Sequence, residues 1–189
     1  MGFDLYGARP IERTEKPEIL EQNWQDISED EREEYWKVSS DYEECNPGVY
    51  FRNNVWYWRP LWAYVCQVCY EVMSEDDMEA GTHNGGVKIS MKKARKMYKI
   101  LETLIDAGEV QKEEERYKKS LEDMPLETCS VCDGSGKKRP GDSDPKRKKC
   151  WKCEGTGEQE NWMTSYPFIE KNVVEFSHFL RDCGGFRIC

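Results

Sequence analysis

Hydrophobic residues recur at helical spacing over much of the chain, and this pattern predicts a mainly helical protein. Two neighbouring apolar stripes between residues 60 and 73 predict a deeply buried helix that begins at Pro60. A second amphipathic helix is predicted from Ser90, a favourable N-cap, to Gly108, a favourable terminator. Further helices are predicted over about 28–38, 74–81, 110–123 and 172–183.

The N-terminal third of the chain has a different pattern. Residues 1–17 contain two prolines and are predicted to form an irregular arm. Ser28 and Glu31 have the spacing of a capping box. Residues 49–58, VYFRNNVWYW, are β-branched and aromatic and predict an extended segment. The fold class expected is therefore α+β, with a mainly helical small domain. A zinc-clamped β-hairpin is expected as well, because of the cysteine pattern described next.

The strings CSVCDGSG (129–136) and CWKCEGTG (150–157) share the pattern CxxCxGxG. Each CxxC presents two thiolates from a tight turn, and four thiolates complete a tetrahedral zinc site. The 17 residues between the two pairs fit the spacing of such sites. No coordination position is left for water, so one structural zinc per chain is predicted, with these four ligands: Cys129, Cys132, Cys150 and Cys153.

The zinc segment divides the chain into three predicted parts. Residues 1–128 are expected to form the helical domain with its aromatic-rich extended segment. Residues 129–157 are expected to form the zinc hairpin. Residues 158–189 are expected to carry a C-terminal helix that packs back on the helical domain.

The chain is acidic, with a net charge of −9 over 189 residues. Residues 12–44 hold 13 acidic and 4 basic residues, whereas 137–149 hold seven basic and two acidic residues. This basic arm could bind nucleic acid, or its lysines could offset the negative charge of a zinc–thiolate cluster. The net charge favours the second interpretation, and no binding of long nucleic acid is expected.

A cytoplasmic protein without a membrane partner is expected. No apolar run approaches the roughly 20 residues of a membrane span, and the opening MGFDLYGARP lacks the basic and apolar regions of a signal peptide. Nine cysteines without such a signal favour metal binding or free thiols over disulfides.

Residues 50–64 hold seven aromatic residues and two arginines but no acid. Aromatic rings stack on planar ligands and arginine binds phosphate, so this segment suggests a site for a nucleotide-like molecule. The glycine loop and lysine-rich helix start that follow could bind the anionic part. The alternatives are a core strand with its arginines paired to acidic helices, and a solvated basic helix face. The predicted ligand-binding residues are Arg52, Trp56, Trp58, Arg59, Trp62, His83, Asn84, Lys88, Lys92 and Lys93.

No enzymatic constellation is recognisable. Cys66 and Cys69 form a third CxxC, but they are predicted to lie within a helix, whereas redox pairs use the helix start to lower a thiol pKa. Buried structural thiols are expected there. A second metal site that includes Cys183, Cys189 or His83 is the alternative.

Two resemblances arise from these motifs. The knuckles resemble the cysteine-rich region of DnaJ-type chaperones, which has four CxxCxGxG units where this chain has two, and the chain has no His-Pro-Asp string. The segments MGFDLYG, FRNNVWYWRPLW, ENWMTSYPF and GGFRIC, together with the knuckles, resemble an uncharacterised family of small bacterial and phage proteins. That resemblance implies a phage setting, a role against host defence and the host cell cytoplasm.

The function expected is that of a non-enzymatic, zinc-stabilised binding protein that captures a small anionic, nucleotide-like ligand. The alternative is a protein-binding inhibitor or adaptor module that acts on a host protein through its acidic helices. A zinc-ribbon nucleic-acid binder and a thiol enzyme are the remaining hypotheses.

Overall fold

The computed structural model describes residues 2–141, 143–144 and 146–189. The chain forms two compact units. The first, here called the core unit, comprises Met1–Glu114 and Phe168–Cys189; the second, the hairpin unit, comprises Glu115–Pro167. Six α-helices and small antiparallel sheets in the described residues confirm the predicted α+β class.

A four-stranded antiparallel sheet lies in the core unit, in the order β2-β1-β6-β3. The predicted irregular arm is wrong over its first residues, because β1 is an inner strand paired with both β2 and β6. The alternation in GFDLYG buries Phe3 and Leu5, and both prolines of the arm lie beyond the strand. The strands are β1 (Gly2–Gly7), β2 (Tyr50–Asn54), β3 (Lys88–Ile89) and β6 (Phe186–Ile188).

The two faces of this sheet have different chemistry. The inner face carries buried apolar side chains and packs on helices; for example, the Phe3 ring stacks on Trp58 and the Phe51 ring lies 5.3 Å from that of Phe176. The outer face carries polar and aromatic side chains that are exposed or half-buried, namely those of Asp4, Tyr6, Tyr50, Arg52, Lys88 and Arg187.

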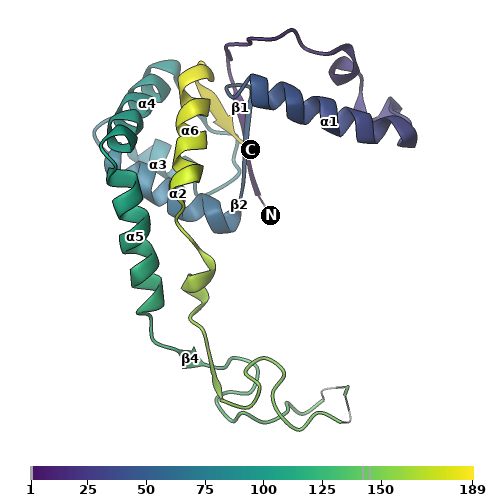
Figure 1. The fold of residues 1–189 in the computed structure, drawn as a ribbon, viewed down its shortest axis with the longest axis vertical. Helices are drawn as coiled ribbons and strands as arrows, with labels where there is room; N and C mark the ends of the chain where they lie inside the picture. Colours follow the sequence, from purple (N-terminus) through teal and green to yellow (C-terminus); the bar gives the residue numbers. More distant parts are fainter. Residues whose placement is uncertain (1, 142, 145) are drawn as a thin grey trace. The chain divides into compact units, whose positions relative to one another are not determined.

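Helices α4 and α6 pack against each other in the core unit. In Figure 1, α6 lies beside α4. The α-helices are α1 (Glu29–Cys45), α2 (Val55–Val68), α3 (Glu75–Ala80), α4 (Met91–Asp106), α5 (Glu109–Glu122) and α6 (Glu170–Asp182). Three short 3₁₀ turns are η1 (Glu18–Glu21), η2 (Trp24–Asp26) and η3 (Trp162–Ser165).

Helix α2 begins five residues before the predicted start at Pro60. The Asn54 side chain accepts hydrogen bonds from the amides of Trp56 and Tyr57 and so caps the helix. The extended prediction for 49–58 is therefore correct only as far as Asn54. Aromatic and β-branched propensity suggested a longer strand, but the cap and the burial of Trp58 favour a helix.

The predicted helix starts at Ser28, Ser74 and Ser90 are confirmed. Ser28 and Ser74 each form a capping box, and the Ser90 side chain accepts a hydrogen bond from the Lys93 amide. Helix α1 continues to Cys45, well past the predicted end, although Tyr42 is its one buried residue.

A buried carboxylate ties the segment after β1 to α6. Asp182, 3% exposed, pairs with Arg13 at 2.5 Å and with Arg181 at 2.9 Å. Burial would raise the pKa of Asp182, but hydrogen bonds from both arginines outweigh it and hold the pKa below its usual range. The backbone amides of Ala8, Arg9 and Ile11 also donate to the chain around Asp182, so this segment is held in place.

Candidate metal centre and ligand surface

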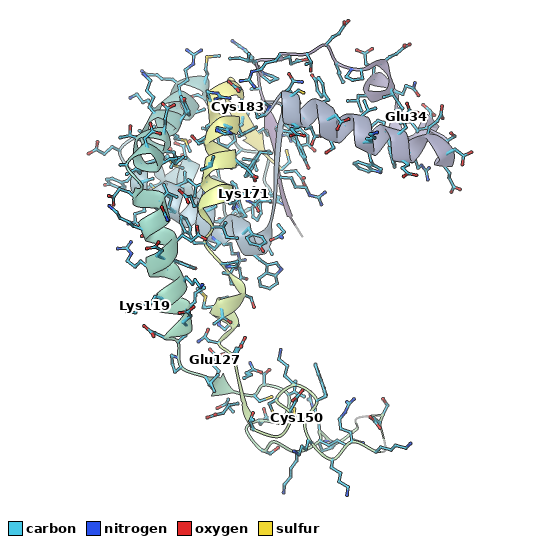
Figure 2. The ribbon with its side chains drawn as sticks, in the orientation of Figure 1. Glu34, Lys119, Glu127, Cys150, Lys171 and Cys183 are labelled. Atoms are coloured by element: carbon cyan, nitrogen blue, oxygen red, sulfur yellow. The ribbon has the colours of Figure 1, made fainter. Side chains whose placement is uncertain are left out.

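Four cysteine sulfur atoms come together in the hairpin unit, which carries Cys150 in Figure 2. All four lie within 4.8 Å of one another and all four residues are buried. Two contacts join the knuckles: Cys129 Sγ lies 3.8 Å from Cys150 Sγ, and Cys132 Sγ lies 3.7 Å from Cys153 Sγ. These separations are far longer than a disulfide bond, so the sulfur atoms are free to act as ligands.

The two knuckles have nearly the same backbone, which explains the repeated glycines. The Cys129 amide donates to the Gly157 carbonyl at 2.8 Å, and the Cys150 amide donates to the Gly136 carbonyl at 2.9 Å. Both glycines have positive φ, 82° and 65°. A Cβ on either would lie within 2.4 Å of a carbonyl oxygen of the opposite knuckle. Glycine is therefore required where the two turns cross.

Backbone amides also stabilise the sulfur atoms. The amides of Gly136 and Gly157 donate to the sulfur atoms of Cys132 and Cys153, each at 3.3 Å. Amide donors of this kind favour thiolates and orient metal ligands. The short strands β4 (Glu127–Thr128) and β5 (Glu158–Gln159) pair at the base of the hairpin, and Lys137 forms a bridge with Lys149 farther along it.

The donor set and its dimensions fit a tetrahedral metal ion. Metal–sulfur bonds of about 2.3 Å give a tetrahedron with edges of about 3.8 Å. Two sulfur–sulfur distances, 3.7 and 3.8 Å, match that edge, and the others do not exceed 4.8 Å. In the residues that the structure describes, this is the one group of three or more His, Cys, Asp or Glu side chains close enough to share an ion.

The other cysteine pair has the environment of structural thiols. Cys69 is buried and Cys66 is half-buried on α2. Burial raises the pKa of Cys66 to about 11 and that of Cys69 to about 12. Cys183, at the end of α6 in Figure 2, is likewise buried, and its pKa is raised to about 12. Neutral thiols of this kind are poor nucleophiles.

We expect iodoacetamide at pH 7.5 to modify the exposed Cys45 well before Cys66, Cys69 or Cys183. Peptide mass spectrometry after timed quenching measures each rate, and denatured protein treated with a chelator serves as the control. Equal rates for Cys66 and Cys69 in folded and denatured protein would show that these thiols are not protected.

The structure does not assemble the predicted ligand site as a whole. Trp58 is fully buried and Trp62 is 4% exposed, and their rings stack at 5.1 Å. Their indole N–H groups donate to the carbonyls of Gly81 and Met78. Both side chains belong to the core, and the predicted stacking of a ligand on them is wrong.

Four of the predicted ligand-binding residues contact other groups of the protein. Lys93 pairs with the buried Asp77, and Arg52 lies 3.6 Å from Asp4. The Asn84 side chain donates to the Gly2 carbonyl, and His83 lies 3.6 Å from Glu79. Of these, Arg52 and His83 keep most of their side chains exposed and remain able to bind a ligand.

The other predicted residues are on the surface. Trp56, Arg59, Lys88 and Lys92 are exposed. Trp56 and Arg59 lie on α2, whereas Lys88 lies on β3 and Lys92 on α4.

An aromatic cavity lies where α1, η1 and η2 meet the outer face of the sheet. Its volume is about 810 Å³. Two groups of rings line it: Tyr6 and Tyr50 on the sheet, 5.2 Å apart, and Trp24, Tyr35 and Trp36 on the helical side, with Trp24 5.1 Å from each neighbour. The polar side chains in the lining include Lys16, Ser39, Glu43 and Arg52.

Sequence reasoning identified Arg52 but missed the rings of this cavity. These rings come from four segments that are separated in sequence and divided among β1, η2, α1 and β2. The usable signal was the aromatic pair Tyr35–Trp36 within an otherwise acidic segment.

Family models, curated proteins and solved structures give no match to this chain. None of the helices in the described part of the chain combines the length and apolar character needed to cross a membrane.

Proposed function

We propose that this chain is a non-enzymatic, zinc-stabilised binding protein that captures a small anionic, nucleotide-like ligand on the outer face of its sheet. The observation that carries the proposal is the aromatic cavity, which joins exposed rings to Arg52 and Lys16. Its position differs from the one predicted from sequence, but the chemistry is the same.

Zinc is the metal that suits the cysteine cluster best. Four thiolates in a tetrahedral arrangement favour zinc over the hard cations, which prefer oxygen ligands. A fully protein-bound ion has no open position for water or substrate. Its role is then to hold together a hairpin with little apolar core of its own. Within the described part of the hairpin, Val131 is the one partly buried hydrophobic residue packed on the four cysteines.

The aromatic cavity has the size and lining of a small-molecule site. Ligand pockets commonly measure about 300–1,000 Å³ and combine apolar walls with a few polar groups. Trp36 is 62% exposed, Tyr6 50% and Trp24 37%, so their ring faces are accessible for stacking. The guanidinium of Arg52 can bind a phosphate or carboxylate.

The surroundings of the reactive groups support a binding role over catalysis. The thiols of Cys66, Cys69 and Cys183 have raised pKa values through burial. His178 is exposed on α6 and His83 lies in an exposed loop. The proposal therefore assigns no catalytic residue.

Isothermal titration calorimetry tests this proposal. Nucleosides, nucleoside mono- and diphosphates and cyclic nucleotides are titrated into protein of known metal content. Cyclic nucleotides are included because of the resemblance to phage-associated proteins. We expect at least one Kd in the micromolar range. Trp36→Ala should weaken it about tenfold, because stacking contributes about 1–3 kcal/mol. Trp151→Ala, which removes a 58% exposed Trp from the hairpin unit, is the control.

A protein-binding module is the second candidate, and α1 supports it. The helix has eight acidic and two basic residues and one buried side chain. Figure 2 labels Glu34 on this helix, and most of its acidic side chains are exposed. Such a surface suits a basic partner protein. If every nucleotide-like probe binds more weakly than about 1 mM, the small-ligand proposal fails and this candidate replaces it.

A further inference from the structure

A basic groove of about 510 Å³ lies at the outer face of the same sheet. Three cations line it: Arg9 from the segment after β1, Lys88 from β3 and Arg187 from β6. Among the residues that the structure describes, no carboxylate side chain lines this groove. This is unusual in a chain with 37 acidic residues and 28 basic ones.

The three cations lack acidic partners. Within the described residues, Arg9, Lys88 and Arg187 make no ion pair with a carboxylate, and all three are exposed. Lys88 and Arg187 are also directly opposite each other in the β3–β6 register. Like charges in this position repel and destabilise the strand pair. A bound anion would relieve that repulsion.

The groove is a formed feature of the backbone. The Ala8 amide donates to the Gly185 carbonyl at 2.7 Å, and the Arg9 amide donates to the Cys183 carbonyl at 3.1 Å. A Cβ added to Gly184 would lie 2.1 Å from the Arg9 carbonyl oxygen, so the two segments are in close contact. The lining is thus held before any ligand binds, which lowers the entropic cost of binding.

The basic groove adjoins the aromatic cavity. Tyr6 lines both. The strand register places Tyr50, Tyr6, Arg187 and Lys88 in one row across β2, β1, β6 and β3. With strands about 4.8 Å apart, this row spans about 14 Å. One molecule with a planar ring and a charged chain can contact both ends of such a row.

The aromatic cavity and the basic groove differ in charge. Glu43 lines the aromatic cavity and Asp4 lies beside Arg52, so these two carboxylates offset the positive charges of Lys16 and Arg52. A chain of phosphates is therefore attracted less strongly there than to the basic groove. The carboxylate of Glu43 could instead accept a hydrogen bond from a base amino or imino group. In the basic groove, by contrast, the charged side chains among the described residues are all cations. This distribution places the ring in the aromatic cavity and the phosphates in the groove.

We infer that the basic groove is a phosphate subsite and that the ligand is a nucleoside carrying at least two phosphates. Arg9, Lys88 and Arg187 would bind the phosphate chain while the rings of the aromatic cavity bind the base. This inference rests on the proposed function, because the aromatic cavity supplies the other half of the site.

Calorimetry with paired probes separates the two proposals. The four common ribonucleosides and their 5′-diphosphates are titrated at 50 mM and 200 mM salt. We expect one diphosphate to bind at least tenfold more tightly than its nucleoside at the lower salt concentration. Arg187→Ala and, independently, Lys88→Ala should remove most of that gain and leave the affinity for the nucleoside unchanged. Both side chains are exposed, and thermal melting verifies that each variant is folded.

Lys96→Ala is the matched control, because it removes an exposed cation from α4 outside the groove. Equal affinity for nucleoside and diphosphate would overturn the phosphate subsite and leave the aromatic site intact. A gain that falls equally in Lys96→Ala and Arg187→Ala would also overturn it, because net charge alone would then explain the effect. Absence of binding by every nucleoside and diphosphate would overturn both proposals.

Discussion

Replacing Cys132 with Ser is expected to abolish metal binding and unfold residues 127–159 while the core unit stays folded. The serine hydroxyl does not replace a thiolate in a closed four-sulfur site. Structural zinc contributes apparent binding free energies of about 10–16 kcal/mol in small zinc domains, and the metal site is also the main buried cluster of this hairpin. Little else can hold the two knuckles together once an ion is lost.

Elemental analysis and hydrogen exchange measure this effect. The unaltered protein is expected to contain about one zinc per chain and to protect the amides of Cys129 and Cys150, which are bonded across the knuckles. Cys132→Ser should lose both the zinc and that protection. Cys45→Ser, which removes an exposed thiol of the core unit, should keep them. Full zinc content in Cys132→Ser would refute the four-thiolate site, and two zinc ions per unaltered chain would reveal a second site.

The cysteine cluster could be predicted from sequence because its information is local. Two thiols from one turn, glycines at fixed offsets and 17 intervening residues determine which sulfur atoms meet. The helix caps were predictable for the same reason, since Ser28 and Glu31 bind each other within one turn.

The sheet and the ligand surface depend on contacts that are distant in sequence. β1 pairs with strands that lie about 45 and 180 residues farther along the chain, and its own apolar pattern is limited to Phe3 and Leu5. No local signal specifies such pairing. The same applies to Tyr6, Arg187 and Lys88, which become neighbours through strand register alone.

The aromatic residues of α2 show where composition misleads. Trp56, Trp58 and Trp62 looked equally suited to stacking on a ligand, yet the turn of the helix exposes the first and buries the other two. Glycine at 81 confirms how closely the core packs there, since a Cβ would lie 2.0 Å from the Trp62 ring. Burial therefore separates stabilising aromatic residues from those available for binding.

The difference in burial between Trp58 and Trp56 predicts different effects of their replacement on stability. Trp58→Ala should lower the free energy of unfolding of the core unit by about 3–5 kcal/mol, because it removes a fully buried ring. The ring stacks on Phe3 and Trp62 and its N–H donates to the Gly81 carbonyl at 2.6 Å, so contacts in three parts of the core unit are lost together. Trp56→Ala removes a ring that is 46% exposed and should cost about 1 kcal/mol or less.

Urea denaturation of the two variants, followed by hydrogen exchange in the core unit, provides the measurement. Trp58→Phe is the intermediate case, since it retains an aromatic ring but leaves the Gly81 carbonyl without its indole donor. Any folded Trp58→Ala protein should still bind the ligand of the aromatic cavity, because Trp58 does not line that cavity. A small loss of stability combined with a large loss of ligand affinity would reverse the assignment and restore Trp58 to the binding site.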